Sequence, residues 1–221
     1  MRPFTLLVAA ATCTLAVAAV AQIGPVTVTP AATAFKLGTL KLATLRDAAN
    51  IAPNDAKVFG VDVGPAAVDA VLAAAGVPTG QISLSVTALL VRTPGHVVLI
   101  DTGYGAPRGI LLASLAAARV APDQVTDVLI SHGHSDHVGG LMNAEGKPVF
   151  ARASVRMAAA EWASIQSQPA NAKLVAAIGA QVRPFEAGAA VLPGITSVDL
   201  NGHTPGHSGY RVNQINEAHP V

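Results

Sequence analysis

Three histidines and one aspartate lie within six residues, at His132, His134, Asp136 and His137. Neutral imidazole nitrogen and carboxylate oxygen are ligands that zinc and similar metals take from proteins. In an extended segment His132 and His134 point the same way, and a turn begun at Ser135 can carry Asp136 and His137 toward a neighbouring point. The cluster directly follows an apolar run at 125–130 that predicts a buried strand. This arrangement favours a metal site over a polar loop of surface histidines.

A further histidine, His203, follows His132 by 71 residues and must be brought to the cluster by folding. If folding brings this residue, or the nearby His207, to His132 and His134, the three imidazoles would form a zinc centre with one coordination position open. Such a centre lowers the pKa of water to about 7 and generates hydroxide at neutral pH. A structural zinc site would close that position instead, and with no cysteine available to close it the catalytic arrangement is favoured.

Two more motifs accompany the cluster: LIDTG at 99–103 before it and GHTPGH at 202–207 after it, with Gly139 and Gly140 directly behind the histidines. With these three motifs in this order, the chain resembles the metallo-β-lactamase superfamily of zinc hydrolases. It is most similar to the exported branch that contains methyl parathion hydrolase and N-acyl homoserine lactone lactonases. The resemblance runs from about residue 35 to residue 212. It implies an α/β fold, the four-layer αββα sandwich, which we expect to be incomplete at the C-terminus.

The resemblance also implies a role for each site residue. His203 is the expected ligand of its motif, with His207 a hydrogen-bonded structural residue and an alternative ligand. Asp101 is expected to fix the ligand loop from behind. Asp136 and His137 would begin a second metal site, so that one or two Zn²⁺ ions are expected, and Asp136 would also hold or relay a proton.

The family normally completes the second site with a bridging aspartate and one further histidine, both after the equivalent of residue 212. The last residues of this chain contain only His219, beside Pro220, which is a poor substitute. A natural protein without these C-terminal strands would have an exposed sheet edge. We therefore expect that the chain is truncated and lacks them. A single-metal or inactive descendant is the alternative.

The N-terminus has the three parts of a secretory signal peptide over residues 1–21. Arg2 is followed by an apolar run and then by small residues that suit cleavage. The alternative, an uncleaved membrane anchor, is less favoured because the run is short for a bilayer span. Cys13, the only cysteine, lies within this run, so any metal in the exported chain must be held by nitrogen and oxygen ligands. The expected location is periplasmic or secreted.

Composition and charge point to a small-molecule partner. Hydrophobic residues make up 51% of the chain and charged residues 12%, which favours a folded domain. Removal of residues 1–21, which contain Arg2 and no acid, leaves 14 − 1 = 13 basic and 13 acidic residues. We therefore expect no nucleic-acid binding, and no membrane association once the signal is removed. The sequence leaves the oligomeric state open.

The expected organisation is an extended lead-in at 22–34 and one domain at 35–221. Asp47, at the end of a first strand pair, is expected to be a solvated turn residue; an approach to the site in the manner of the family is the alternative. His96 is expected to be a surface residue at a hairpin tip. A loop at 50–64 is expected to border the substrate cleft. Strands are predicted at 35–46, 84–92, 97–100, 125–130, 149–151, 181–185 and 194–200, and helices at 65–75, 110–119, 154–165 and 171–178.

The favoured function is an exported zinc-dependent hydrolase whose metal-bound hydroxide attacks a small ester-like bond, in a lactone or a phosphotriester. Hydrolysis of a β-lactam or a thioester is the alternative within the family, because the ligands indicate the reaction type and not the substrate. An alternative of another class is a non-catalytic zinc-binding fragment.

Overall fold

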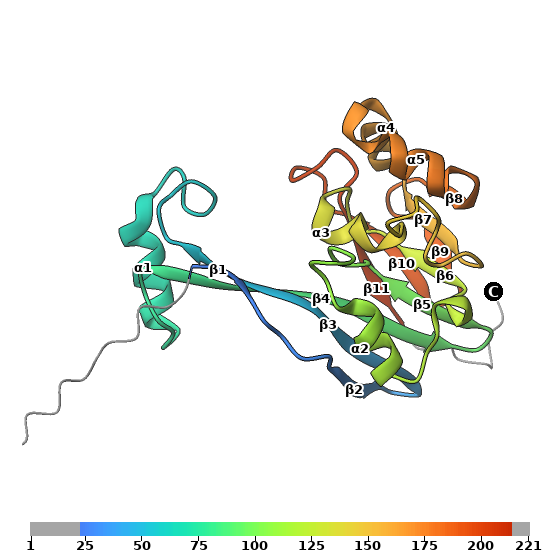
Figure 1. Ribbon diagram of the computed structural model, residues 1–221, viewed down its shortest axis with the longest axis horizontal. Coiled ribbons are helices and arrows are strands. Elements are labelled where there is room, and N and C mark those ends of the chain that lie inside the picture. The colour runs from blue at the N-terminus through green and yellow to red at the C-terminus, as the bar shows by residue number, and fades with distance from the viewer. Residues whose placement is uncertain (1–22, 214–221) are drawn as a thin grey trace, which may run out of the picture.

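The computed structural model describes residues 23–213 and consists of a layered body with a long arm (Figure 1). The signal-peptide prediction at 1–21, Cys13 and His219 lie outside the described residues. An eight-stranded sheet runs through both parts, in the order β1-β3-β4-β5-β6-β7-β8, with β2 paired to β3. Its strands are β1 (Gly24–Val26), β2 (Ala32–Leu37), β3 (Leu40–Pro53), β4 (Gln81–Thr93), β5 (His96–Ile100), β6 (Asp127–Leu129), β7 (Ser154–Ala158) and β8 (Val182–Phe185).

A smaller antiparallel sheet packs against one face of the large sheet. It contains β9 (Ala190–Leu192), β10 (Ile195–Asp199) and β11 (Ser208–Val212), in the order β11-β10-β9. The two sheets bury a common apolar core that includes Leu42, Val91, Val98, Leu129 and Ile195. This face-to-face packing places the ends of β6 and β10, which carry the predicted ligand loops, at one edge of the body.

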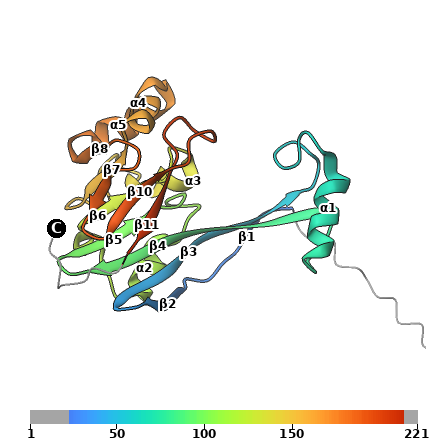
Figure 2. The same cartoon turned by 180° about the vertical axis from the view of Figure 1, so that it is seen from behind.

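Helices cover the other face of the large sheet: α2 (Leu111–Ala117), α4 (Ala159–Ser167) and α5 (Ala172–Ile178). The core beneath them contains Leu45, Leu90, Leu115, Phe150 and Ile165, each with no more than 2% of its surface exposed. The α/β fold class predicted from the sequence is confirmed, with layers in the order helix, sheet, sheet. Within residues 23–213 no helix covers the outer face of the small sheet (Figure 2).

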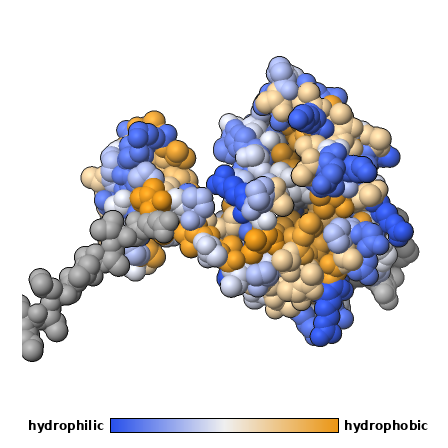
Figure 3. Space-filling view, viewed as in Figure 1, coloured by the Kyte–Doolittle hydropathy of each residue, from blue (hydrophilic) through white to orange (hydrophobic). Residues whose placement is uncertain are grey.

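The arm consists of β3 and β4, which continue beyond the body as a ribbon and end at α1 (Gly64–Ala74) (Figures 1 and 2). The predicted helix at 65–75 is therefore confirmed, and no residue of α1 is buried. Apolar side chains also lie exposed at this end of the arm, at Val58, Val61, Val63 and Val71 (Figure 3). No helix among the described residues combines the length and apolar character needed to span a bilayer.

Asp47 is not the solvated turn residue that the sequence suggested. β3 continues to Pro53, so Asp47 lies inside the strand, at an irregularity in the register with β4, and its surface is 0% exposed. Its carboxylate accepts hydrogen bonds from the backbone N–H groups of Tyr104 (2.8 Å) and Leu111 (3.0 Å). Burial raises the pKa of Asp47, and these backbone bonds offset only part of that effect. The residue therefore anchors the loop between β5 and α2.

Two other local predictions are wrong. No strand forms at 149–151, where the chain bends, and residues 154–158 form β7 instead of the start of a helix. Val155 and Met157 alternate into the core between β6 and β8, and this burial overrides the helical preference of the alanine-rich segment. The helix begins only at Ala159, in α4.

His96 is a partly buried member of an ionic cluster, not an isolated surface residue. Its Nδ1 lies 2.8 Å from Oδ2 of Asp127, and Nε of Arg156 donates to the other carboxylate oxygen at 3.0 Å. Burial alone would raise the pKa of Asp127, but the hydrogen bonds from His96, Thr126 and Arg156 outweigh it, so that the pKa is lowered. The cluster joins β5, β6 and β7 at the ends remote from the ligand loops.

Candidate metal centre

The structure brings together the three histidines that the sequence singled out. His132 and His134 lie in the loop after β6, and His203 lies in the connection between β10 and β11. The ring centroid of His203 lies 4.7 Å from that of His132 and 4.6 Å from that of His134. One potential ligand atom from each of the three residues lies within 4.8 Å of the others. Within residues 23–213 no other group of three or more such side chains converges in this way.

The spacing of the His132 and His134 nitrogens and the chemistry of all three donors fit a zinc ion. Nε2 of His132 lies 3.1 Å from Nδ1 of His134. Two nitrogens bound tetrahedrally to one zinc at 2.0–2.1 Å are about 3.3 Å apart, so the two rings are already at the required separation. Burial, helped by the neighbouring imidazoles, lowers the pKa of His132 to about 4. His132 is therefore neutral at pH 7, which is the form that binds a metal.

Asp101, to which the family resemblance assigned a supporting role, contacts the start of the ligand loop. Its carboxylate accepts hydrogen bonds from the N–H (2.7 Å) and hydroxyl (2.8 Å) of Ser131, and lies 2.9 Å from Nδ1 of His137. Asp101 itself has φ = 62°, a left-handed conformation that aspartate tolerates better than most residues and that turns the chain sharply after β5. The Ser131 hydroxyl is also 3.1 Å from Nδ1 of His132.

Asp136 and His137 lie beside the three histidines and form a pair of their own. Both belong to α3 (Ser135–Val138), a single helical turn, and Oδ2 of Asp136 lies 3.5 Å from Nε2 of His137. The His137 ring is 3.9 Å from the His132 ring. Burial alone would lower the pKa of His137, but Asp101 and Asp136 raise it above its ordinary value. This pair supplies two of the donors that a second ion would need.

His207 lies at the margin of the cluster. Its ring centroid is 4.8 Å from that of His132 and 5.5 Å from that of His203, and it is not part of the converging group. Burial lowers its pKa. The backbone carbonyl of His207 accepts a hydrogen bond from the N–H of Leu200 (2.9 Å), which closes the connection between β10 and β11.

Two residues that the sequence did not single out join the ligand loops to their surroundings. Glu161, in the first turn of α4, is only 2% exposed and contacts both ligand loops. The hydroxyl of Tyr210 donates to the carbonyl of Ile130 at 2.7 Å and so joins β11 to the segment that enters the ligand loop. Glutamate in a helix and tyrosine in a strand are common, so nothing in their local sequence distinguishes them.

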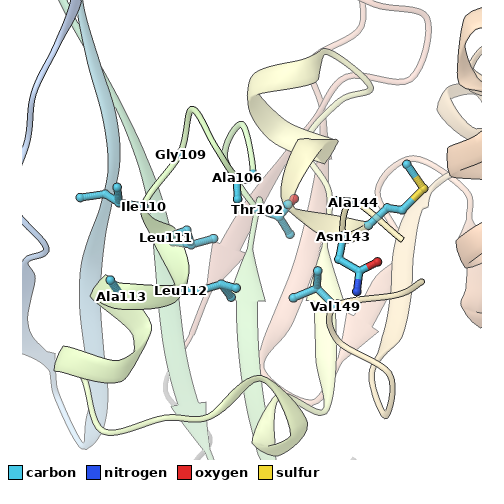
Figure 4. Close-up of a pocket in the computed structure, with 13 residues that line it drawn as sticks. Thr102, Ala106, Gly109, Ile110, Leu111, Leu112, Ala113, Asn143, Ala144 and Val149 are labelled. Carbon is cyan, nitrogen blue, oxygen red and sulfur yellow. The ribbon is translucent and has the colours of Figure 1, made fainter. Parts of the chain in front are cut away.

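An apolar pocket of about 350 Å³ lies behind the ligand loop, on the helix side of the large sheet (Figure 4). Leu111, Leu112 and Val149 are among its lining residues, and Thr102 and Gly140 form part of its wall. Thr102 also contacts the ligand loop, because its N–H and hydroxyl both donate to the carbonyl of His137. None of the three converging histidines lines this pocket.

Comparison with known families and curated proteins gives a consistent result. The sequence model of the family described as "Metallo-beta-lactamase superfamily" matches residues 82–216. Metallo-beta-lactamase domain-containing protein 1 of Xenopus laevis is 37% identical over 113 residues, which are 51% of this chain and 40% of that protein. The protein of the same name from Mus musculus is 54% identical over 44 residues, 20% of this chain and 17% of that protein. The matches thus span less than half the length of these curated relatives.

Solved structures with the same fold cover more of the chain. AidC, described as a dizinc quorum-quenching lactonase in complex with a product, is 25% identical with a TM-score of 0.76. The match covers 85% of this chain and 72% of that one. The hydrolase AbOPH of the beta lactamase superfamily is 24% identical with a TM-score of 0.72, over the same shares of the two chains.

Proposed function

The chain belongs to the metallo-beta-lactamase superfamily, and from this premise we propose that it is a zinc-dependent hydrolase of a small ester-like bond, in a lactone or a phosphotriester. The observation that carries the proposal is the convergence of His203 on His132 and His134 from a different sheet. Three imidazoles without a cysteine favour a metal centre that keeps a position open for reaction over a closed structural site.

Different residues of the chain would bind the metal, position the ligand loop and transfer a proton. His132, His134 and His203 would hold the ion, and Asp101 fixes the loop from which two of them project. A bound zinc ion supplies Lewis acidity toward a carbonyl or phosphoryl oxygen and lowers the pKa of water to about 7. Asp136 retains a third of its side-chain surface in solvent, so its carboxylate is accessible to accept a proton and pass it on.

The substrate class rests on analogy. The similarity to AidC, a lactonase, supports a lactone, and the sequence resemblance to methyl parathion hydrolase supports a phosphotriester. β-Lactam and thioester hydrolysis are alternatives within the family, because the ligand set does not select the substrate. We also propose export, on the basis of the sequence of residues 1–21 alone.

The test combines metal analysis with a substrate panel. Purified protein is loaded with zinc, its metal content is measured, and hydrolysis of a lactone, a phosphotriester, a thioester and a β-lactam is assayed. His132→Ala serves as the control for contaminating hydrolases. Zinc-dependent turnover of the lactone or the phosphotriester, absent in the control, supports the proposal. Turnover restricted to the thioester or the β-lactam would replace the proposed substrate class.

One observation favours a second candidate, a zinc-binding protein without turnover. In the part of the chain that the structure describes, Asp136 and His137 form only a pair, whereas the first site has three converging donors. If the reaction of the family needs two ions, a chain that binds only one would not hydrolyse the substrate. About one bound zinc per chain with no hydrolysis of any substrate in the panel would support this candidate.

A further inference from the structure

We propose that Glu161 is a positioning residue that sets the relative geometry of the three histidines by holding both ligand loops with one carboxylate. The inference rests on the proposed metal site, and it assigns a role to a residue that does not itself belong to the converging group.

The contacts of Glu161 reach both loops. Its Oε1 accepts the N–H of Gly133 at 2.7 Å, and its Oε2 accepts the hydroxyl of Thr204 at 2.7 Å and the N–H of Gly206 at 2.9 Å. Gly133 lies between His132 and His134, and Thr204 follows His203 directly. Oε1 therefore holds the backbone between His132 and His134. Oε2 holds the Thr204 side chain beside His203 and the backbone at Gly206, and the distance between the two oxygens is covalently fixed.

The two loops have few other direct ties. The N–H of Ser208 donates to the carbonyl of Ser131 at 2.9 Å, and the hydroxyl of Tyr210 donates to the carbonyl of Ile130 at 2.7 Å. Both bonds lie where the ligand loops meet the strands. Glu161 contacts the loops farther from the strands, at Gly133, Thr204 and Gly206. Since the loops belong to different sheets, a small rotation of one sheet relative to the other would separate His203 from His132 unless a third element opposed it.

The fit of the loops on α4 is close enough to make this contact specific. A Cβ atom added at Gly133 would lie 2.7 Å from Cγ1 of Ile165 and 3.0 Å from Oε1 of Glu161. A Cβ at Gly206 would collide with the backbone nitrogen of Glu161. Both loops thus rest directly on the first two turns of the helix, and only glycine allows that approach at these two positions.

The chemistry of the contact requires a carboxylate. All three partners are donors, and an ionised carboxylate offers only acceptors. In Glu161→Gln the side-chain amide would direct N–H groups at one of the loops, so one loop would keep its bond and the other would lose it. Because Glu161 is 2% exposed, water cannot easily replace the lost bond. We expect this one-sided loss to displace one set of histidines relative to the other.

The experiment compares Glu161→Gln with Asp127→Asn. Asp127 is a matched control, because it is also a buried carboxylate with three hydrogen-bond donors but lies at the opposite end of β6. Zinc affinity is measured by competition with a chromophoric chelator, and the visible absorption of the Co²⁺-loaded protein reports ligand geometry. We expect Glu161→Gln to weaken zinc binding about 10- to 100-fold, the effect typical of residues that orient ligands, and to change the Co²⁺ spectrum. Asp127→Asn should lower the melting temperature and leave both metal readouts unchanged.

Hydrogen exchange of the metal-free protein separates this inference from the proposed function. The backbone amides of Gly133 and Gly206 should be protected in the wild type, and at least one of them should lose protection in Glu161→Gln. If the wild type bound no zinc, the proposed function would fail, while these two amides would still decide whether Glu161 ties the loops. Wild-type protection of both amides in the variant, or wild-type zinc affinity, would overturn the inference.

Discussion

Removal of the His203 imidazole gives the most direct test of the metal centre. Zinc sites with four ligands are worth about 10–16 kcal/mol in peptides, or roughly 3 kcal/mol for each ligand. His203 is the only donor of the converging group that comes from the small sheet. His203→Ala should therefore raise the zinc dissociation constant about 100-fold, and leave a two-histidine remainder that holds the ion poorly.

Thermal unfolding with and without zinc makes that loss measurable. At a zinc concentration of 100 times its dissociation constant, the wild type gains about 2.7 kcal/mol of stability, or a rise in melting temperature of roughly 5–11 °C for a domain of this size. At the same concentration His203→Ala would be about half saturated and gain about 0.4 kcal/mol, which is a rise of roughly 1 °C.

His96→Ala is the matched control, because it removes an imidazole that lies 2.8 Å from Asp127 and outside the converging group. It should lower the melting temperature without zinc and keep the full zinc-induced rise. An undiminished rise in His203→Ala, or a lost rise in His96→Ala, would show that the ion is bound elsewhere.

Three further predictions concern other parts of the structure. Asp101→Asn should weaken zinc binding about 10- to 100-fold in chelator competition, because Ser131 and His137 lose the acceptor that orients them; unchanged affinity would contradict this role. Asp127→Asn should cost about 2 kcal/mol, reduced from the value for a fully buried pair because its partners are partly exposed, and should lower the melting temperature by roughly 4–8 °C. The folded pKa of Asp127 lies below its ordinary value of 3.8, so this contribution to stability is present above pH 3.8 and is lost as the pH falls through the folded pKa. Melting temperatures of the wild type and of Asp127→Asn, measured from pH 3 to pH 7, should therefore converge at the acid end. A constant difference between them would refute the assignment. Phe150→Ala, at a site 1% exposed, should cost about 3–5 kcal/mol in urea unfolding, and a loss below 1 kcal/mol would place Phe150 outside the core.

The parts of the fold that follow from local patterns could be predicted from the sequence. The hairpin of β4 and β5 follows from two apolar runs joined by Pro94 and Gly95, and α1 from Pro65 at its start and Gly76 beyond its end. The histidine cluster could also be predicted from local sequence, because four potential ligands lie within six residues. The convergence of His203 could be expected only from the family resemblance, since no local pattern specifies which strand ends meet.

The errors have a common physical origin in tertiary context. β7 contains residues that favour a helix by composition, but a strand is needed there to pair with β6 and β8. Asp47 resembles a turn residue because aspartate usually ends a strand, and its burial depends on N–H groups that lie more than 50 residues away in the sequence. No window of sequence around Asp47 contains these partners.

Three carboxylates, two of them buried and one half-buried, explain how an irregular site can be rigid. Loops that carry ligands cannot satisfy their N–H groups within a helix or a sheet, and a buried N–H without an acceptor costs about 1–3 kcal/mol. Asp47, Asp101 and Glu161 each accept backbone N–H groups from a different segment of the site: the loop before α2, the start of the ligand loop, and both ligand loops together. A carboxylate suits this purpose better than an amide because it accepts at both oxygens and donates at neither. Short hydrogen bonds offset part of the desolvation cost of each carboxylate, so loss of any one acceptor should loosen its own segment first and leave the two-sheet core folded.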